Sequence, residues 1–211
     1  MPIFFQQPVN DNTRLGIWKI EETEEYFRGN VPVHRDVTHP HKRLQHLAGR
    51  FLLQFMYPDF PYALIQIADT KKPYLTDEQY HFSISHCGDY AAAIVSKTQR
   101  VGVDIELPVE KILRIRSKFS TDEEFSMINS QYTMFKLPTA HCQLPTVIWS
   151  TKEAIFKWYG AGGVDFKNDI QLRKIDPEKE MVECYFEKTR QELVIHYREL
   201  DGGLVLTWIA E

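Results

Sequence analysis

Two carboxylates one residue apart, Asp104 and Glu106, end the apolar segment VGVDIE at residues 101–106. On a β-strand, residues i and i+2 share a face, so these side chains leave the strand about 6–7 Å apart. Two negative charges at this spacing repel each other unless a cation lies between them. Mg²⁺ prefers carboxylate oxygens, completed by water and phosphate. The pair indicates a magnesium site, although D-x-E taken alone is better explained by a solvated strand end.

An acid and a lysine lie four residues apart in WSTKEAIFKWYG, residues 149–160, as Glu153 and Lys157. On a helix this spacing places both on one face. They are either an ordinary helix salt pair or a third metal ligand and a phosphate clamp. Trp149 is interpreted as a packing anchor for the helix.

A hydroxyl and an imidazole, Ser85 and His86, follow the expected strand in HFSISHCGDY and precede a turn. A phosphate can be bound there by both side chains and by backbone N–H groups. Because adjacent strand residues point to opposite faces, the two are poorly placed as a nucleophile and its base. Lys72, Arg43 and Arg50 could add charge-assisted contacts to an anion, although each alone is more often a solvated charge.

The composition excludes several classes of protein. The chain has 211 residues, 43% of them hydrophobic, which is enough to bury a substantial core. A net charge of −4 provides no basic field for nucleic acid. The N-terminal residues lack a signal pattern and no window reaches about 18 apolar residues, so we expect a cytoplasmic protein without a membrane partner. Three widely spaced cysteines, Cys87, Cys142 and Cys184, indicate reduced thiols rather than disulfides or zinc.

The elements that must position these residues follow from hydrophobic periodicity. Apolar residues at helical spacing predict a long helix over about 40–57, ended near Pro58, with Arg43 and Arg50 two turns apart on its polar side. Alternating and apolar runs predict strands at 3–7, 14–20, 64–68, 81–85, 90–96 and 101–106.

The second half predicts three helices and four strands. A short basic helix lies in KILRIRSKF, and Ser120 with Glu123 forms a capping box that begins the next helix. Residues 129–144 are expected to be irregular. Pro145 is an early residue of a helix that Gly160 ends. Antiparallel strands are expected near 170–175, 181–187, 192–197 and 203–209.

Taken in order, KKPYL, FSISHC, VGVDIE and WSTKEAIFKWYG resemble the signature blocks of the 4'-phosphopantetheinyl transferase superfamily, and the chain length resembles its larger, Sfp-like class. The resemblance implies an α+β fold, a pseudo-dimer of two similar α/β lobes, each with a small, mainly antiparallel sheet packed on a long helix. The N-terminal lobe would span 1–105 and the C-terminal lobe 106–211, with the active site in the cleft between them. Two halves in one chain favour a monomer.

The resemblance also implies an activity. Members of the family, including holo-[carrier protein] synthases, transfer the phosphopantetheine arm of coenzyme A to a serine of an apo acyl or peptidyl carrier protein and release 3',5'-ADP. Asp104, Glu106 and Glu153 would hold Mg²⁺, or Mn²⁺ in its place, against the pyrophosphate. Lys157 would contact a phosphate. Glu153 or a metal-bound water would be the general base, and these four residues would be the catalytic set.

The same resemblance implies a coenzyme A site. The phosphates would be bound by Lys72, Ser85, His86 and one or both of Arg43 and Arg50, while Pro73 and Tyr74 would shape the pocket near the adenine. The register of the helix leaves the choice of arginine open. Lys71 departs from the glycine that many members have, and the role of Glu123 stays open.

The carrier protein would be an acidic helical partner. A basic and apolar surface suited to it is provided by Lys111, Arg114, Arg116 and Lys118, unless this is an ordinary solvated helix. Two other functions remain: a different Mg²⁺-dependent phosphoryl or nucleotidyl transferase that shares only D-x-E, and a binding relative without catalysis. The pathway, whether fatty acid, polyketide or nonribosomal peptide synthesis, is left open by the sequence.

Overall fold

A computed structural model of the chain describes residues 3–31, 37–135 and 141–211. The fold is mixed α/β with antiparallel sheets, as expected. The chain forms two compact units, Met1–Ile105 with Ala210–Glu211 and Glu106–Ile209. Within the described ranges, no helix combines the length and apolar character needed to cross a bilayer. The similarity of the two lobes and the cleft between them stay predictions.

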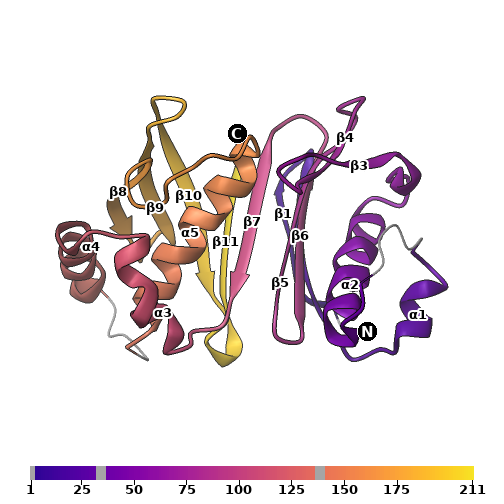
Figure 1. The fold of residues 1–211 in the computed structure, drawn as a ribbon, viewed down its shortest axis with the longest axis horizontal. Helices are drawn as coiled ribbons and strands as arrows, with labels where there is room; N and C mark the ends of the chain where they lie inside the picture. The colour runs from indigo at the N-terminus through magenta and orange to yellow at the C-terminus, as the bar shows by residue number, and fades with distance from the viewer. Residues whose placement is uncertain (1–2, 32–36, 136–140) are drawn as a thin grey trace. The chain divides into compact units, whose positions relative to one another are not determined.

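The first unit is built on an antiparallel sheet with the strand order β1-β2-β6-β5. The helix α2 (Pro40–Met56) lies along this sheet (Figure 1). It begins at Pro40, whose fixed φ suits a first helical position, and its buried residues include Leu47, Leu52 and Met56. The strands are β1 (Ile3–Asn10), β2 (Thr13–Lys19), β5 (His81–Cys87) and β6 (Tyr90–Ser96).

A glycine lets α2 approach β5 closely. A Cβ on Gly49 would lie 2.5 Å from the side chain of Ile84, nearer than real Cβ contacts come. Any larger residue would therefore push the helix from the strand. This contact brings Arg50, the next residue of α2, to the end of β5 that carries His86.

Smaller elements complete the first unit. The expected strand at 64–68 is shorter than predicted, because Tyr62–Leu64 form a 3₁₀ turn and only Ile65–Ile67 pair as β3. β3 forms a hairpin with β4 (Pro73–Leu75). The remaining elements are α1 (Glu24–Arg28) and β7 (Val101–Glu106), the latter with the predicted bounds. The last residue of β7, Glu106, is counted with the second unit.

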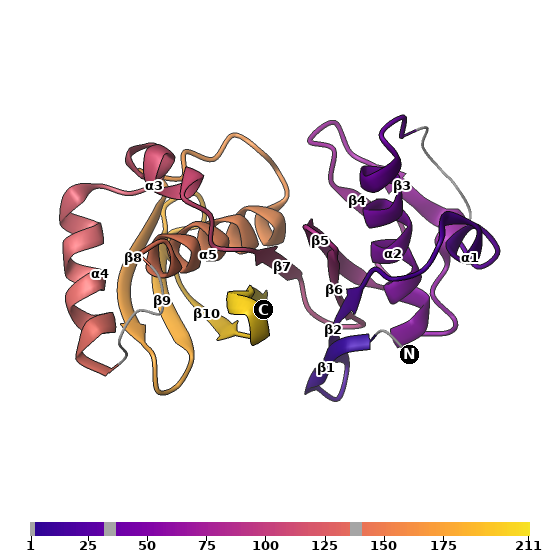
Figure 2. The same ribbon diagram turned by 90° about the horizontal axis from the view of Figure 1, so that it is seen from below.

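In the second unit, β11, β10, β9 and β8 follow one another as antiparallel neighbours. The helices α4 and α5 pack against them (Figure 2). Gly160 ends α5 with φ 71°, as predicted. The elements are α3 (Lys111–Ile115), a 3₁₀ turn (Arg116–Lys118), α4 (Asp122–Phe135), α5 (Gln143–Tyr159), β8 (Ile170–Asp176), β9 (Met181–Phe186), β10 (Gln191–Glu199), a 3₁₀ turn (Asp201–Gly203) and β11 (Val205–Ala210).

Two predictions for α4 are wrong. Thr121, not Ser120, caps the helix, since its Oγ1 accepts the backbone N–H of Glu124 at 3.0 Å. The segment 129–144 is helical at 129–135 and again from Gln143, while 136–140 lie outside the described residues. Tertiary contact explains the longer helix, because Tyr132 is buried and its hydroxyl donates to Glu199 at 2.6 Å.

Candidate active site

Asp104 is buried in the first unit and is hydrogen-bonded to a predicted site residue. Its side chain is 2% exposed, and the hydroxyl of Ser85 donates to its Oδ1 at 2.8 Å. Two residues back on β5, the hydroxyl of Ser83 accepts the N–H of Val103 at 3.2 Å. The same face of β5 thus faces β7 at both positions. A buried carboxylate needs such donors, because its desolvation is otherwise costly.

Glu106 is held by a tryptophan of α5 in the second unit. The indole Nε1–H of Trp149 donates to Oε1 of Glu106 at 3.3 Å. The indole packs against the rings of Phe119 and Phe166, with centroids 5.2 and 5.4 Å away. Trp149 therefore serves as a packing anchor and also orients an acid. One helical turn later on the same face stands Glu153.

Lys157 follows Glu153 by one further turn of α5, and both side chains are partly exposed. Each also takes part in an interaction, so neither is a bare surface charge. The helix thus presents in succession a group that holds Glu106, an acid and a cation. This order suits contact with a metal-bound phosphate.

The chemistry of the three predicted ligands fits a hard cation, since all of them offer carboxylate oxygens. Within the described part of the chain, no three His, Cys, Asp or Glu side chains stand together as a metal-binding group. Mg²⁺ is commonly held by one or two carboxylates, with water and substrate phosphate as its other ligands. The assignment of Asp104, Glu106 and Glu153 as ligands stays a prediction.

A basic pocket of about 340 Å³ opens in the first unit where α2 meets the end of β5 and the β3–β4 hairpin. We call it the α2–β5 pocket. It brings together three of the residues predicted to bind coenzyme A, Arg50, Pro73 and His86. Its lining is His46, Arg50, Ile67, Lys71, Pro73, Ile84 and His86.

The two candidate arginines have different surroundings. Arg50 is 3% exposed, lines the α2–β5 pocket and donates to the imidazole of His46 one turn earlier. Arg43 instead donates to the carboxylate of Glu24 at 2.8 Å and to the carbonyl of Val37 at 2.7 Å. The sequence places both arginines on the polar side of this helix, and Arg50 is nevertheless buried, because α2 packs against the sheet there.

Lys72 and Lys71 lie side by side at the hairpin. Burial, with a smaller contribution from Arg100, lowers the pKa of Lys72 from 10.5 to about 8. Lys71 has φ 66°, the left-handed conformation that glycine adopts without cost. The N–H of Lys71 donates to the carbonyl of Ala68, closing a tight turn that requires this conformation. Lys71 therefore adopts the backbone conformation that a glycine at this position would favour.

Two residues that the sequence reasoning did not select adjoin the predicted site residues, His46 by contact with Arg50 and Lys152 as the neighbour of Glu153 in the chain. His46 contacts Arg50, and the i, i+4 spacing on α2 is the signal that could have found it. Lys152 is wholly buried, and its position between Ile148 and Ile155 on the apolar face of α5 was the available signal. Burial lowers the pKa of Lys152, against the opposing effect of Glu124.

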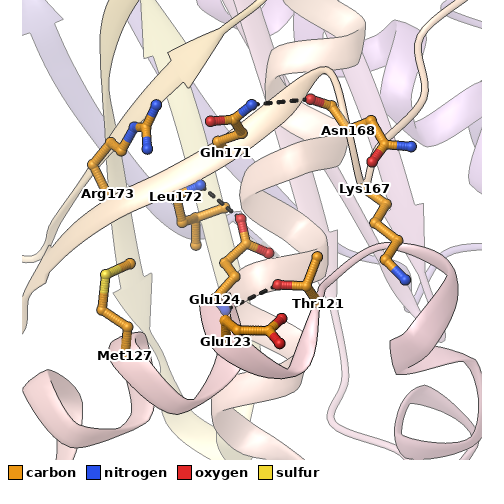
Figure 3. Close-up of a pocket in the computed structure, with 9 residues that line it drawn as sticks. All are labelled: Thr121, Glu123, Glu124, Met127, Lys167, Asn168, Gln171, Leu172 and Arg173. Carbon is orange, nitrogen blue, oxygen red and sulfur yellow. Dashed lines mark hydrogen bonds between the residues drawn. The ribbon is translucent and has the colours of Figure 1, made fainter.

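Glu123 lines a pocket of about 330 Å³ between α4 and β8, shown in Figure 3. Its neighbour Glu124 points inward and accepts the N–H of Leu172 at 2.7 Å, so the two acids have different surroundings. A smaller pocket of about 250 Å³ lies beside Glu106 and Trp149, against α3.

Comparison with known proteins bears on the part of the candidate site that lies within residues 100–209. The family profile described as the 4'-phosphopantetheinyl transferase superfamily matches residues 100–209, just over half of the chain. This range includes the segments that carry Asp104, Glu106, Glu153 and Lys157.

Curated proteins similar to the chain include the L-aminoadipate-semialdehyde dehydrogenase-phosphopantetheinyl transferase of Xenopus laevis, 28% identical over 55% of this chain and 43% of that protein. Enterobactin synthase component D of Escherichia coli K12 is 30% identical over 55% of this chain and 54% of its own length. A putative 4'-phosphopantetheinyl transferase of Haemophilus influenzae is 30% identical, with coverages of 49% and 43%. The chain thus spans about half the length of these relatives. With the profile match over residues 100–209, the chain belongs to the 4'-phosphopantetheinyl transferase superfamily.

Proposed function

We propose that the protein transfers the 4'-phosphopantetheine arm of coenzyme A to a serine of an apo carrier protein and releases 3',5'-ADP. The hydrogen bond from Ser85 to Asp104 carries this proposal, because it joins an expected phosphate-binding residue to an expected metal ligand. His86, the next residue, lines the basic α2–β5 pocket. An anion site and a buried acid therefore adjoin within one folded unit, as a metal-bound pyrophosphate requires.

The reaction needs positioning and charge neutralisation more than covalent help from the enzyme. In this proposal Asp104, Glu106 and Glu153 hold Mg²⁺, which when bound neutralises charge on the pyrophosphate. Lys157 contacts a phosphate. Glu153 accepts the proton of the incoming serine hydroxyl, directly or through a water.

Coenzyme A binding is assigned mainly to the first unit. Arg50 and His86 bind phosphate in the α2–β5 pocket, and Lys72 adds a cation beside it. Pro73 lines the same pocket, and Tyr74, partly exposed on β4, adjoins it in sequence where the adenine is expected. The contacts of Arg43 with Glu24 and Val37 favour Arg50 over Arg43 as the phosphate ligand.

The carrier protein is proposed to bind α3 and the 3₁₀ turn that follows it. Arg116 contributes less to this carrier-binding surface than the sequence suggests, because it is paired with Asp122 and lies over the ring of Phe125 at 4.6 Å. Three basic residues are exposed beside the apolar side chains of Val109 and Leu113, namely Lys111, Arg114 and Lys118. An acidic partner with an apolar contact residue fits this surface. The monomeric state and the cytoplasmic location stay predictions.

The test is transfer itself. The protein is incubated with coenzyme A, Mg²⁺ and several apo acyl and peptidyl carrier proteins, and each carrier is weighed by mass spectrometry. The expected result is a phosphopantetheine adduct that requires Mg²⁺, and the rate of its formation should fall at least about a hundredfold with Glu153→Gln. Glu192→Gln is the matched control, because it makes the same chemical change on an exposed acid of the same unit that has no predicted role. No adduct on any carrier would refute the proposal.

A further inference from the structure

Lys152 is a fully buried cation in the second unit. Its side chain is 0% exposed, and its ammonium donates to the carbonyls of Phe119 and Ile170 at 2.7 Å and of Phe166 at 2.9 Å. The carboxylate of Glu124 accepts from it at 2.9 Å. Because a buried ammonium is costly unless its three protons are bonded, this set of acceptors is what permits the charge.

The acceptors come from separate segments of the chain. Phe119 precedes α4, Phe166 lies in the connection after α5, and Ile170 begins β8. Glu124, in the first turn of α4, also accepts the N–H of Leu172 through Oε1, as Figure 3 shows at the inner side of the pocket. The ammonium of Lys152 thus fixes the start of α4, the connection and β8 to α5.

Two of these acceptor residues have a second contact. The carbonyls of Phe119 and Phe166 bind Lys152, while their rings pack against Trp149. The indole of Trp149 in turn donates to Glu106. A continuous set of contacts therefore leads from the ammonium of Lys152 to the carboxylate of Glu106, and the next residue after Lys152 is Glu153.

We infer that Lys152 is a positioning residue, which holds Phe119 and Phe166 against Trp149 so that the indole orients Glu106 beside the turn that presents Glu153. Its effect on catalysis rests on the proposed function, but its effect on Trp149 does not. Apolar residues of similar volume often replace a buried ion pair without loss of stability. Here stability should still fall, because backbone carbonyls and the N–H of Leu172 lose their partners. The orientation of Trp149, not stability, is therefore the property that tests the inference.

The main test is Lys152→Met with Glu124→Leu, which removes both charges and leaves no lone buried ion. We call this double substitution the cage variant. The matched control is Lys174→Met with Glu183→Leu, a surface pair of the same unit. The indole N–H signals of the four tryptophans are recorded by nitrogen–proton correlation NMR, and Trp149→Phe assigns the signal of Trp149. We expect this signal to shift or broaden in the cage variant while the other three stay in place, and no change in the control.

Calorimetric titration with Mg²⁺ is the second readout. We expect binding about 10–100-fold weaker in the cage variant, the usual effect of losing a group that orients a metal ligand. In transfer assays kcat should fall with little change in KM for coenzyme A. If the Trp149 signal moves but the wild type transfers nothing, the positioning role stands and the proposed function fails.

A folded cage variant with an unmoved Trp149 signal and unchanged Mg²⁺ binding overturns the inference. Should that variant not fold, Lys152→Arg replaces it, because a planar guanidinium cannot donate to the same acceptors in the same geometry. A shifted Trp149 signal in this variant supports the inference, and an unmoved one overturns it. If neither variant folds, Lys152 serves stability alone, which also overturns it.

Discussion

The hydroxyl of Ser85 donates a 2.8 Å hydrogen bond to the buried carboxylate of Asp104. This contact joins β5 to β7 within the first unit. The next residue of β5, His86, is exposed and lines the α2–β5 pocket. The opposite directions of neighbouring strand side chains thus allow β5 to support an acid with one residue and face an anion with the next.

Removing the Ser85 hydroxyl should destabilise the protein. Ser85→Ala leaves the buried Asp104 without this donor, so we expect the free energy of unfolding to fall by about 1–3 kcal/mol. Urea denaturation measures this change in the free energy of unfolding. Ser126→Ala, at an exposed position of α4, should stay within about 0.5 kcal/mol of the wild type. Equal stability of the two variants would contradict the structural role of this bond.

Arg50 and Arg43 should respond differently to the same substitution. Arg50→Gln removes a cation from the α2–β5 pocket, and we expect coenzyme A to bind about 10–100-fold more weakly, the effect of one charge-assisted hydrogen bond. Arg43→Gln breaks the pair with Glu24 and should lower stability while leaving affinity nearly unchanged. Calorimetric titration with coenzyme A and thermal unfolding separate the effects. The reverse pattern would assign the phosphate to Arg43.

Coenzyme A affinity should depend on pH through Lys72. Because burial lowers the pKa of Lys72 to about 8, its charged form is lost in the free protein as the pH rises through that value. A bound phosphate favours the charged form and raises the pKa, so binding takes up a proton and weakens above pH 8. Titrations between pH 7 and 9.5 should show this decline. Lys72→Arg should abolish it, since a guanidinium stays protonated; an unaltered decline in that variant would exclude Lys72 as its source.

Replacing Lys71 by glycine should separate stability from binding. At φ 66° a lysine is strained and a glycine is not, so Lys71→Gly is expected to raise the free energy of unfolding by up to about 1 kcal/mol. The pocket also loses a cation, so coenzyme A should bind more weakly. On the same samples, denaturation measures the free energy of unfolding and calorimetry measures the affinity for coenzyme A. Lys71→Ala is the control, because it removes the charge and keeps the strain; a glycine variant no more stable than this one would show that the turn is not strained.

Local pattern was sufficient for most elements. The strands β6 and β7 have the predicted bounds, and α2 starts at Pro40 as the spacing of its apolar residues indicates. Local pattern was insufficient at α4, where the sequence around Asn129 has little apolar periodicity. That part of the helix is stabilised by the burial of Ile128 and Tyr132 against other elements, which no local window contains.

The sequence by itself determined the candidate chemistry, because residue types and short spacings are local properties: carboxylates two apart on a strand and an acid four residues before a lysine on a helix. Only the tertiary structure decided which charges face which partners. It placed Arg50 in a pocket and Arg43 against Glu24, and it surrounded Lys152 with backbone carbonyls. The reason is physical: the surroundings of a long charged side chain depend on residues distant in the chain. A charge without partners costs little in water, but burial makes it costly.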